Sequence, residues 1–411
     1  MELYRKLKGY GGIYDDVDEV IKGLGSADVV VGIPSRNVAH IVNYVIYNVA
    51  LGIKKYYGTI NAAILVCDGL SSDGTPKVIK VFRKYLDLPT YVLPNIVSKG
   101  KGGALRTIIE LVHRYSDSKA LLLIDSDLRS ITPEWVPLLL EGAKRYGFVT
   151  PLYKRHKFDA TITNFVARPI TSMAYGIDIK QPIGGDFGLS RGLVNALAKA
   201  PWGLNPWSYF FGVDIFITHT ALAKGFTVCE AFLKAKIHEP KDPAKELKGM
   251  FMEVTGSLFT SLKIYEDSWV SKEVSGLTEP PLIKEPEPPD MPPWEVKISK
   301  GRALKVFREG LLKFKEVLSK SLTTDLLRTV YKSKEGLDSD VWAEVCAYMF
   351  RYFIRSEDVN SLKALYHLWQ GRLIKYYDEV SWSEDVSEVL LREVKEFLNI
   401  RDLFKEFMMG R

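Results

Sequence analysis

Short apolar runs of strand length alternate with longer stretches of helical periodicity in the first half of this chain. The predicted strands lie at residues 29–33, 62–67, 120–124 and 228–233. The predicted helices lie at residues 39–50, 103–115, 133–146 and 211–224. This alternation predicts an α/β fold with a largely parallel sheet.

Polar or turn-forming residues follow the first three of these strands. Because the carboxyl ends of the strands form the ligand crevice of an open α/β sheet, these residues are expected to converge on one site. They are Pro34, Ser35 and Arg36 after the first strand, Asp68 after the second, and Asp125, Ser126 and Asp127 after the third.

A composition break separates this region from the rest of the chain. Residues 279–293 are so rich in proline that we expect an extended connector without regular structure, and residues 303–411 are helical in pattern. A chain of 411 residues is also longer than one hydrophobic core usually organises. We therefore predict an α/β domain over 1–276, a linker over 277–299 and a helical domain over 300–411.

The overall composition is that of a globular protein, with 26% charged and 46% hydrophobic residues. The net charge of +6 suits a polyanion such as a nucleotide diphosphate, although it equally suits simple solubility. Three widely spaced cysteines predict neither disulfides nor a zinc cluster and fit a reducing cytoplasm. We find no membrane-spanning run, no signal peptide and no nucleic-acid-binding motif.

The pattern Asp-x-Asp occurs three times, at residues 16–18, 125–127 and 338–340. Only the second copy directly follows a buried-strand pattern, which would bring both carboxylates to the edge of the sheet. Paired carboxylates suit Mg²⁺ or Mn²⁺, and such an ion can bridge the phosphates of a nucleotide diphosphate. The alternative is a solvated turn whose aspartates cap a helix.

Further candidates come from glycine-containing loops. Asp68 ends a strand where it could bind a nucleotide base, and Lys101 opens a helix between glycines, a setting that favours anions. Gln181, Gly184 and Gly185 belong to a loop that could lie against a sugar. Ordinary strand-to-helix loops, an exposed basic loop and tight packing are the respective alternatives.

Single charged residues complete the candidate set. Asp214 begins an apolar helix, where it could act chemically or simply oppose the helix dipole. His238 could complete a metal site with Asp127, or be an ordinary surface residue. The basic cluster at residues 154–157 could hold a carboxylate or phosphate, or form a solvated face.

Taken in order, these motifs resemble those of the GT-A glycosyltransferases, most closely mannosylglycerate synthase and the glucosyl-3-phosphoglycerate synthases. The likeness extends with specific motifs from about Val29 to His238. It implies a retaining sugar transfer from a nucleotide sugar. By resemblance, Asp125 and Asp127 match the metal and donor motif, and His238 matches a further metal ligand. Lys101 matches the donor-phosphate loop, Asp214 matches an acid near the transferred sugar, and Gln181 to Gly185 match the loop that flanks this sugar. Arg155 and Thr163 match the acceptor site.

Three positions depart from the family pattern. Val38 stands where mannosylglycerate synthase has a guanine-reading glutamate, and Gly103 stands where the family usually has an acid. The basic cluster around Arg155 is also denser than a glycerate site needs, which makes phosphoglycerate an alternative acceptor.

The first hypothesis is an Mg²⁺- or Mn²⁺-dependent transfer of mannose or glucose to D-glycerate in the synthesis of a compatible solute. The alternatives are transfer to 3-phosphoglycerate, or a non-catalytic nucleotide-sugar-binding protein. The C-terminal helices would either cover the acceptor side or build a homodimer.

Overall fold

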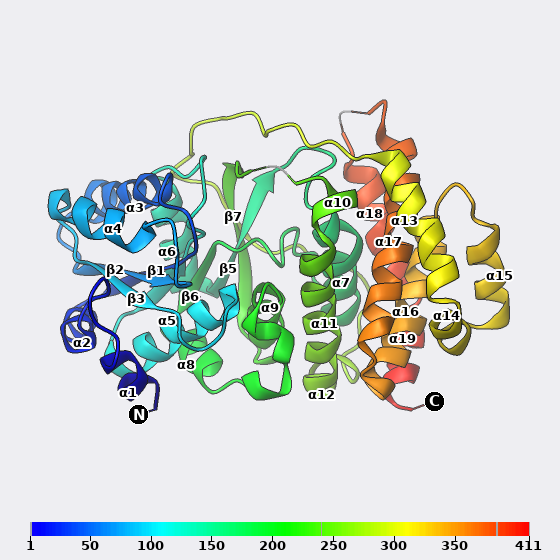
Figure 1. The fold of residues 1–411 in the computed structure, drawn as a ribbon, viewed down its shortest axis with the longest axis horizontal. Helices are drawn as coiled ribbons and strands as arrows, with labels where there is room; N and C mark the ends of the chain where they lie inside the picture. The colour runs from blue at the N-terminus through cyan, green and yellow to red at the C-terminus, as the bar shows by residue number, and fades with distance from the viewer. Residues whose placement is uncertain (1, 240, 384, 411) are drawn as a thin grey trace. The chain divides into compact units, whose positions relative to one another are not determined.

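The computed structural model describes residues 2–239, 241–383 and 385–410 (Figure 1). Its contacts divide the chain into two compact units, each made of several separate segments. The sheet unit comprises Met1–Lys154, Ile183–His238 and Pro280–Pro293. The helical unit comprises Arg155–Pro182, Glu239–Glu279 and Trp294–Arg411. In the described part of the chain, no helix is both long enough and apolar enough to cross a membrane.

The sheet unit is built on one eight-stranded sheet with the strand order β3-β2-β1-β4-β6-β5-β7-β8. The strands are β1 (Val29–Ser35), β2 (Ala62–Asp68), β3 (Thr90–Pro94), β4 (Ala120–Leu123), β5 (Gly147–Lys154), β6 (Phe187–Ser190), β7 (Thr227–Ala235) and β8 (Leu282–Ile283). The predicted α/β class is confirmed, and so are the four strands that the apolar runs indicated.

The sheet is largely parallel, as predicted, with one exception. Strand β6 runs antiparallel to both of its neighbours, β4 and β5. Its first residue therefore lies at the edge of the sheet where β1, β2, β4, β5 and β7 have their carboxyl ends. Residues that precede β6 consequently join those that follow the parallel strands.

Helices cover both faces of the sheet, with α3, α4 and α6 on one side and α2, α5 and α8 on the other (Figure 1). On the first side, apolar residues of β1 and β2 form one core with Val45 and Val49 of α3 and Trp135 of α6. The helices of this unit are α1 (Glu2–Lys8), α2 (Val17–Gly25), α3 (Val42–Tyr57), α4 (Thr75–Phe82), α5 (Lys101–Tyr115), α6 (Trp135–Tyr146), α8 (Arg191–Ala198) and α9 (Val213–Ala223), with short 3₁₀ turns at Arg83–Tyr85, Trp202–Leu204 and Pro206–Tyr209.

The proline-rich connector contains a strand, which corrects the expectation that it has no regular structure. Leu282 and Ile283 form β8 and pair with Glu230 and Ala231 of β7. The backbone N–H of Glu230 also donates to the carbonyl of Pro281 at 2.8 Å. Proline is tolerated here because an edge strand needs hydrogen bonds on one side only. The segment 280–293 is therefore part of the sheet unit rather than a free linker.

The helical unit includes residues that the sequence placed in the first domain. Its helices are α7 (Arg168–Tyr175), α10 (Pro243–Glu246), α11 (Lys248–Ile264), α12 (Glu266–Trp269), α13 (Lys300–Lys313), α14 (Lys315–Ser321), α15 (Thr324–Lys332), α16 (Ser339–Ser356), α17 (Val359–Val380), α18 (Ser387–Asn399) and α19 (Arg401–Met408), preceded by a π-helix, η2 (Thr163–Ala167). The helical C-terminal region is confirmed. The units differ, however, from the predicted domains 1–276 and 300–411.

Hydrogen bonds from buried side chains explain this difference. The guanidinium of Arg401 donates to the carbonyls of Met173 at 2.9 Å, Trp269 at 2.7 Å and Lys272 at 2.9 Å. The indole N–H of Trp342 donates to the carbonyl of Phe165 at 2.8 Å. Because buried carbonyls require donors, these bonds tie residues 155–182 and 239–279 to the C-terminal helices.

A buried ion pair lies inside the helical unit. Arg372 of α17 and Glu393 of α18 are both fully buried, and the Arg372 Nη2 atom lies 2.9 Å from the Glu393 Oε2 atom. Burial raises the pKa of Glu393 to about 7, although Arg372 opposes this shift. The unfolded chain has the ordinary glutamate value of 4.5, so the folded state binds a proton more tightly.

The Glu393→Gln variant should therefore remove a pH dependence of stability. The contribution from protonated Glu393 is complete below pH 4.5 and is lost as the pH rises through about 7. We expect the unfolding free energy of the wild type to fall by on the order of 2 kcal/mol between about pH 5 and about pH 8, and that of the variant to change less. Denaturant titrations across this range measure it, with Glu388→Gln at an exposed position of α18 as control. Parallel curves for wild type and Glu393→Gln would contradict the assignment.

Candidate active site

Two lysines, one buried and one largely buried, hold the carboxylate of Asp125, which follows β4. Lys101, the first residue of α5, places its Nζ atom 2.8 Å from the Asp125 Oδ1 atom. Lys236, directly after β7, places its Nζ atom 2.7 Å from the Asp125 Oδ2 atom. Each oxygen of this carboxylate therefore contacts a different ammonium group.

Two further acids contact the same lysines. The Nζ atom of Lys101 lies 3.1 Å from the Asp214 Oδ2 atom, and that of Lys236 lies 2.8 Å from the Asp186 Oδ2 atom. The Asp125 backbone N–H donates to Asp186 Oδ1 at 2.8 Å. We call Lys101, Asp125, Asp186, Asp214 and Lys236 the charge cluster. With three carboxylates and two ammonium groups, it has one negative charge in excess when every member is ionised.

The proton affinities in this cluster are unequal because burial and charge act in opposite directions. Burial alone would raise the pKa of Asp125, but Lys101 and Lys236 outweigh it and hold this pKa well below its ordinary value. Burial raises the pKa of Asp214 to about 6, against the influence of Lys101, and it also raises the pKa of Asp186. Asp125 is thus the firmly ionised acid of the cluster.

A glycine allows the loop before β6 to approach Asp125. Gly185 has a φ of +86°, in the left-handed region, and a Cβ atom there would collide with the Asp125 Oδ2 atom. The neighbouring carbonyl of Gly184 accepts a hydrogen bond from Lys236 Nζ at 2.7 Å. The predicted sites Gly184, Gly185, Lys101, Asp125 and Asp214 therefore meet in one place.

The glycines around Lys101 have a packing role. A Cβ atom at Gly102 would collide with the carbonyl of Ser208, and the Gly102 N–H donates to the carbonyl of Phe210 at 3.2 Å. The first turn of α5 is therefore packed against the segment 208–210. In this loop, the Lys101 side chain contacts the carboxylates of Asp125 and Asp214.

Asp68 organises the loops after β1 and β2. Its Oδ1 atom accepts hydrogen bonds from the hydroxyls of Ser35 at 3.1 Å and Ser71 at 2.6 Å. Its Oδ2 atom accepts from the Tyr14 hydroxyl at 3.0 Å and from the Ser71 N–H at 2.8 Å. Pro34 is buried in β1, and Arg36 donates to the Lys99 carbonyl at 3.1 Å. Four donors thus occupy the Asp68 carboxylate, which favours a supporting role over direct contact with a base.

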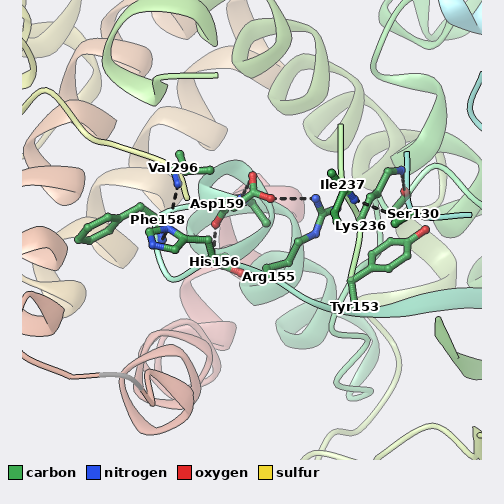
Figure 2. A network of polar contacts seen from close by, with 12 residues as sticks. Ser130, Tyr153, Arg155, His156, Phe158, Asp159, Lys236, Ile237 and Val296 are labelled. Carbon is green, nitrogen blue, oxygen red and sulfur yellow. Dashed lines mark hydrogen bonds and ion pairs between the residues drawn. The ribbon is translucent and has the colours of Figure 1, made fainter. Parts of the chain in front are cut away.

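The segments that contain Asp127 and His238 lie side by side. The Ile237 N–H donates to the Ser130 hydroxyl at 2.9 Å, as Figure 2 shows, and the Arg129 N–H donates to the Ile237 carbonyl at 2.9 Å. Asp127 is exposed, His238 is half-buried and Ser126 is buried. Within residues 2–239, 241–383 and 385–410, no three His, Cys, Asp or Glu side chains gather as a ready-made metal site. Mg²⁺ commonly binds one or two protein groups together with substrate phosphates and water, so a small ligand set fits it.

The predicted acceptor residues belong to the helical unit. Thr163 is buried and begins the π-helix η2, a rare element that is frequent at functional sites. The Arg155 Nη1 atom lies 2.9 Å from the Asp159 Oδ2 atom (Figure 2). Gln181, in the same unit, is buried, and its Oε1 atom accepts no hydrogen bond from any described residue.

The other members of the basic cluster have structural partners. The Lys154 Nζ atom lies 2.8 Å from the Asp290 Oδ1 atom. Lys157 donates to the carbonyls of Val380, Ser381 and Ser383 at 3.2, 3.1 and 3.0 Å, and so caps the end of α17. The His156 Nδ1 atom accepts from the Phe158 and Val296 N–H groups at 3.3 and 3.2 Å.

Sequence reasoning missed three residues at the charge cluster. Lys236, Tyr153 and Asp186 are not among the predicted site residues, although Asp186 directly follows the predicted Gly185. The Tyr153 hydroxyl donates to the Asp186 Oδ2 atom, and the Lys236 Nζ atom lies 5.3 Å from the centre of the Tyr153 ring. Lys236 stands two residues before His238 in an apolar stretch, which was the available signal.

The Gly185→Ala variant tests the close approach to Asp125. The added methyl would force this loop away from the carboxylate and strain the backbone, at a cost of about 1 to 3 kcal/mol. If the cluster is the active site, kcat/KM should fall by about tenfold to a hundredfold. Gly203→Ala is the matched control because no atom lies within 4 Å of its added Cβ. Equal activity of the Gly185→Ala and Gly203→Ala variants would remove Gly185 from the site.

Comparisons with known proteins show which family this chain resembles. The family model described as "Mannosylglycerate synthase, GT domain" matches residues 29–260. A mannosylglycerate synthase of Selaginella moellendorffii is 23% identical over 301 residues, which cover 67% of this chain and 66% of that protein. This chain therefore aligns with about two thirds of the length of that relative.

Solved structures of glucosyl-3-phosphoglycerate synthase from Mycobacterium tuberculosis are more distant. One, in complex with Mn²⁺, UDP-glucose and phosphoglyceric acid, has 19% identity and a TM-score of 0.47, and the match covers 63% of this chain and 85% of that one. Another, with Mn²⁺, UDP-glucose and glycerol 3-phosphate, has 18% identity and a TM-score of 0.46, with coverage of 66% and 93%. Because the family model spans more than half of its residues, this chain belongs to the mannosylglycerate synthase glycosyltransferase family.

Proposed function

We propose that this protein transfers mannose or glucose from a nucleotide-diphosphate sugar to D-glycerate. One observation carries the proposal beyond family membership. The Oδ1 atom of Asp214 is buried beside Lys101 and accepts no hydrogen bond from any residue that the structure describes. A buried carboxylate oxygen without a donor costs free energy, and a sugar hydroxyl would supply that donor.

Residues of the charge cluster would bind the donor. Lys101 has a buried ammonium group that attracts the diphosphate, and Asp125 and Ser126 lie at the adjoining end of β4. Pro34 and Ser35 are the last residues of the neighbouring strand β1, and Arg36 follows them; the nucleoside would lie here. Asp68 would support this region through Ser35 and Ser71. Gly184 and Gly185 bring the loop before β6 against Asp125. We also assign Gln181 to the donor site, as the resemblance implies.

Asp127 and His238 would hold an Mg²⁺ or Mn²⁺ ion. A carboxylate and an imidazole on adjacent segments suit such an ion, and Mn²⁺ accepts the imidazole nitrogen more readily than Mg²⁺ does. When bound, the ion would neutralise negative charge on the nucleotide diphosphate leaving group. Lys101 would add its own positive charge to the same phosphates.

Asp214 would orient the transferred sugar through a hydroxyl group, with Asp125 fixing Lys101 beside it. In the transfer, the bond from the anomeric carbon to the diphosphate breaks, with its electron pair leaving on the diphosphate oxygen. A bond from the anomeric carbon to the acceptor oxygen forms, and the acceptor hydroxyl passes its proton to the departing diphosphate. Retention of configuration is the stereochemistry implied by the resemblance to retaining GT-A enzymes.

Plain glycerate is favoured as the acceptor over 3-phosphoglycerate. Arg155 and Thr163 would bind its carboxylate and a hydroxyl group. The density of the basic cluster was the reason to consider a phosphate, but Lys154 pairs with Asp290, and Lys157 caps α17. These two cations thus already have structural roles. Arg155 pairs with Asp159 through one guanidinium nitrogen, and a glycerate carboxylate would share the same guanidinium.

A matrix of donors and acceptors would test the reaction. Purified protein with Mg²⁺ or Mn²⁺ is incubated with GDP-mannose, GDP-glucose, UDP-glucose or UDP-mannose and with D-glycerate or 3-phosphoglycerate, and products are identified by mass. We expect glycosylglycerate as the main product. A clear preference for 3-phosphoglycerate would replace the acceptor. Donor binding without transfer or hydrolysis in every combination would favour a non-catalytic nucleotide-sugar-binding protein instead.

The Asp127→Ala variant tests the metal assignment. Loss of one of two protein ligands should lower transfer by more than about a hundredfold, equivalent to about 3 kcal/mol of transition-state stabilisation. Rates across a Mn²⁺ titration measure it. Asp340→Ala, in another Asp-x-Asp sequence and exposed on α16, should keep wild-type rates. Full activity of Asp127→Ala in the presence of a chelator would refute a metal role for this residue.

A further inference from the structure

Lys236 connects several chain segments that meet beside the donor site. Its Nζ atom contacts Asp125 Oδ2 at 2.7 Å, the Gly184 carbonyl at 2.7 Å and Asp186 Oδ2 at 2.8 Å. Its side chain is only 6% exposed. These partners come from the end of β4 and from the loop that leads into β6. The ammonium group of Lys236, directly after β7, thus links the end of β4 to the loop before β6.

The charge of Lys236 is needed where it lies. Asp125 and Asp186 are held together by the hydrogen bond from the Asp125 N–H to Asp186 Oδ1, so their carboxylates lie close to each other in a buried place. Lys236 contacts the Oδ2 atoms of both. A neutral side chain at this position would leave two buried acids facing each other, and breaking a buried ion pair costs several kcal/mol.

The backbone before Lys236 is shaped to deliver it. The pairing of β5 with β7 shifts by one residue between Leu152 and Tyr153, and Lys234 has a positive φ of 61°. Such a β-bulge changes the alternation of side chains after it, and bulges are frequent beside active sites. Tyr153, at the same irregularity, supplies both a hydroxyl for Asp186 and a ring beside the ammonium of Lys236.

We propose that Lys236 is a positioning residue for the donor site, which holds the Asp125 carboxylate and the Gly184–Asp186 loop in the geometry that binds the nucleotide sugar. This inference rests on the proposed function. Lys236 holds Asp125 in place. Through Asp125 it also places Lys101, whose Nζ atom contacts the other oxygen of the same carboxylate. Lys236 acts through these groups rather than on the reacting atoms.

Variants at Lys236 and Asp186 test this role by their effect on the KM for the donor. Lys236→Met should lower kcat/KM by about a hundredfold, mainly through a higher donor KM, because Asp125 and its loop lose their common partner. Asp186→Asn alone should lower kcat/KM by about tenfold, less than Lys236→Met does, since the amide oxygen can still accept from the Asp125 N–H while the amide NH2 group faces the Lys236 ammonium. In the double variant, removal of one buried charge should recover at least about tenfold of the activity lost in Lys236→Met.

Lys236→Arg keeps the proposal testable if Lys236→Met does not fold. The larger, planar guanidinium keeps the charge but cannot reproduce the compact ammonium contacts, so we expect a folded protein with a donor KM raised by about tenfold. Lys144→Met is the control, because Lys144 pairs with Glu141 on α6 and lies outside the charge cluster. It should keep the wild-type KM for the donor.

Calorimetric binding of GDP and UDP with Mn²⁺ separates this inference from the proposed function. A wild type that binds a nucleotide but transfers no sugar would contradict the function, while weaker binding by Lys236→Arg would still support the positioning role. Wild-type donor KM and nucleotide affinity in Lys236→Arg would overturn the proposal. It would also be overturned if the double variant were no more active than Lys236→Met, or if that variant lost only kcat and thermal stability.

Discussion

The contact of Asp125 with two lysines is the interaction on which the rest of the site depends. A largely buried carboxylate is stable only when its charge is compensated. Here Lys101 contacts one oxygen of Asp125 and Lys236 contacts the other. Asp186 and Asp214 use the remaining contacts of the same two cations. A change at one member therefore alters the environment of every other member. This mutual dependence explains why the cluster needs side chains from so many elements of the sheet unit.

The topology of the sheet makes that convergence possible. Parallel strands bring Asp125 and Lys236 to one edge, because each residue follows the carboxyl end of its strand. Asp186 reaches the same edge by the opposite route, since it precedes β6, which runs antiparallel to β4. A sheet with β6 parallel would place residue 186 at the far edge. The direction of one short strand thus decides whether Asp186 can pair with the lysine that also holds Asp125.

Sequence alone could predict the parts of the site that obey local rules. Apolar runs located β1, β2 and β4, and the polar residues after them identified Asp68 and Asp125 as candidates. It could not predict Lys236 or Tyr153, because their roles depend on a bulge and on the direction of β6, neither of which leaves a periodic signal. The domain boundaries were equally inaccessible: residues 155–182 join the helical unit through bonds such as that from Trp342 to Phe165, which link positions far apart in the chain.

The same reasoning changes the meaning of basic residues in this protein. In the sequence, the two groups of basic residues look alike. The cluster 154–157 lies at the end of a strand, and Lys101 lies between glycines. In the structure, Lys157 satisfies backbone carbonyls at the end of a helix, whereas Lys101 is buried among acids. A cation that caps a helix already has its partners, while one among carboxylates beside a buried, unsatisfied oxygen of Asp214 lies where a polar ligand is needed. Charge density in the sequence therefore does not distinguish these two groups of cations; the partners of each charge do.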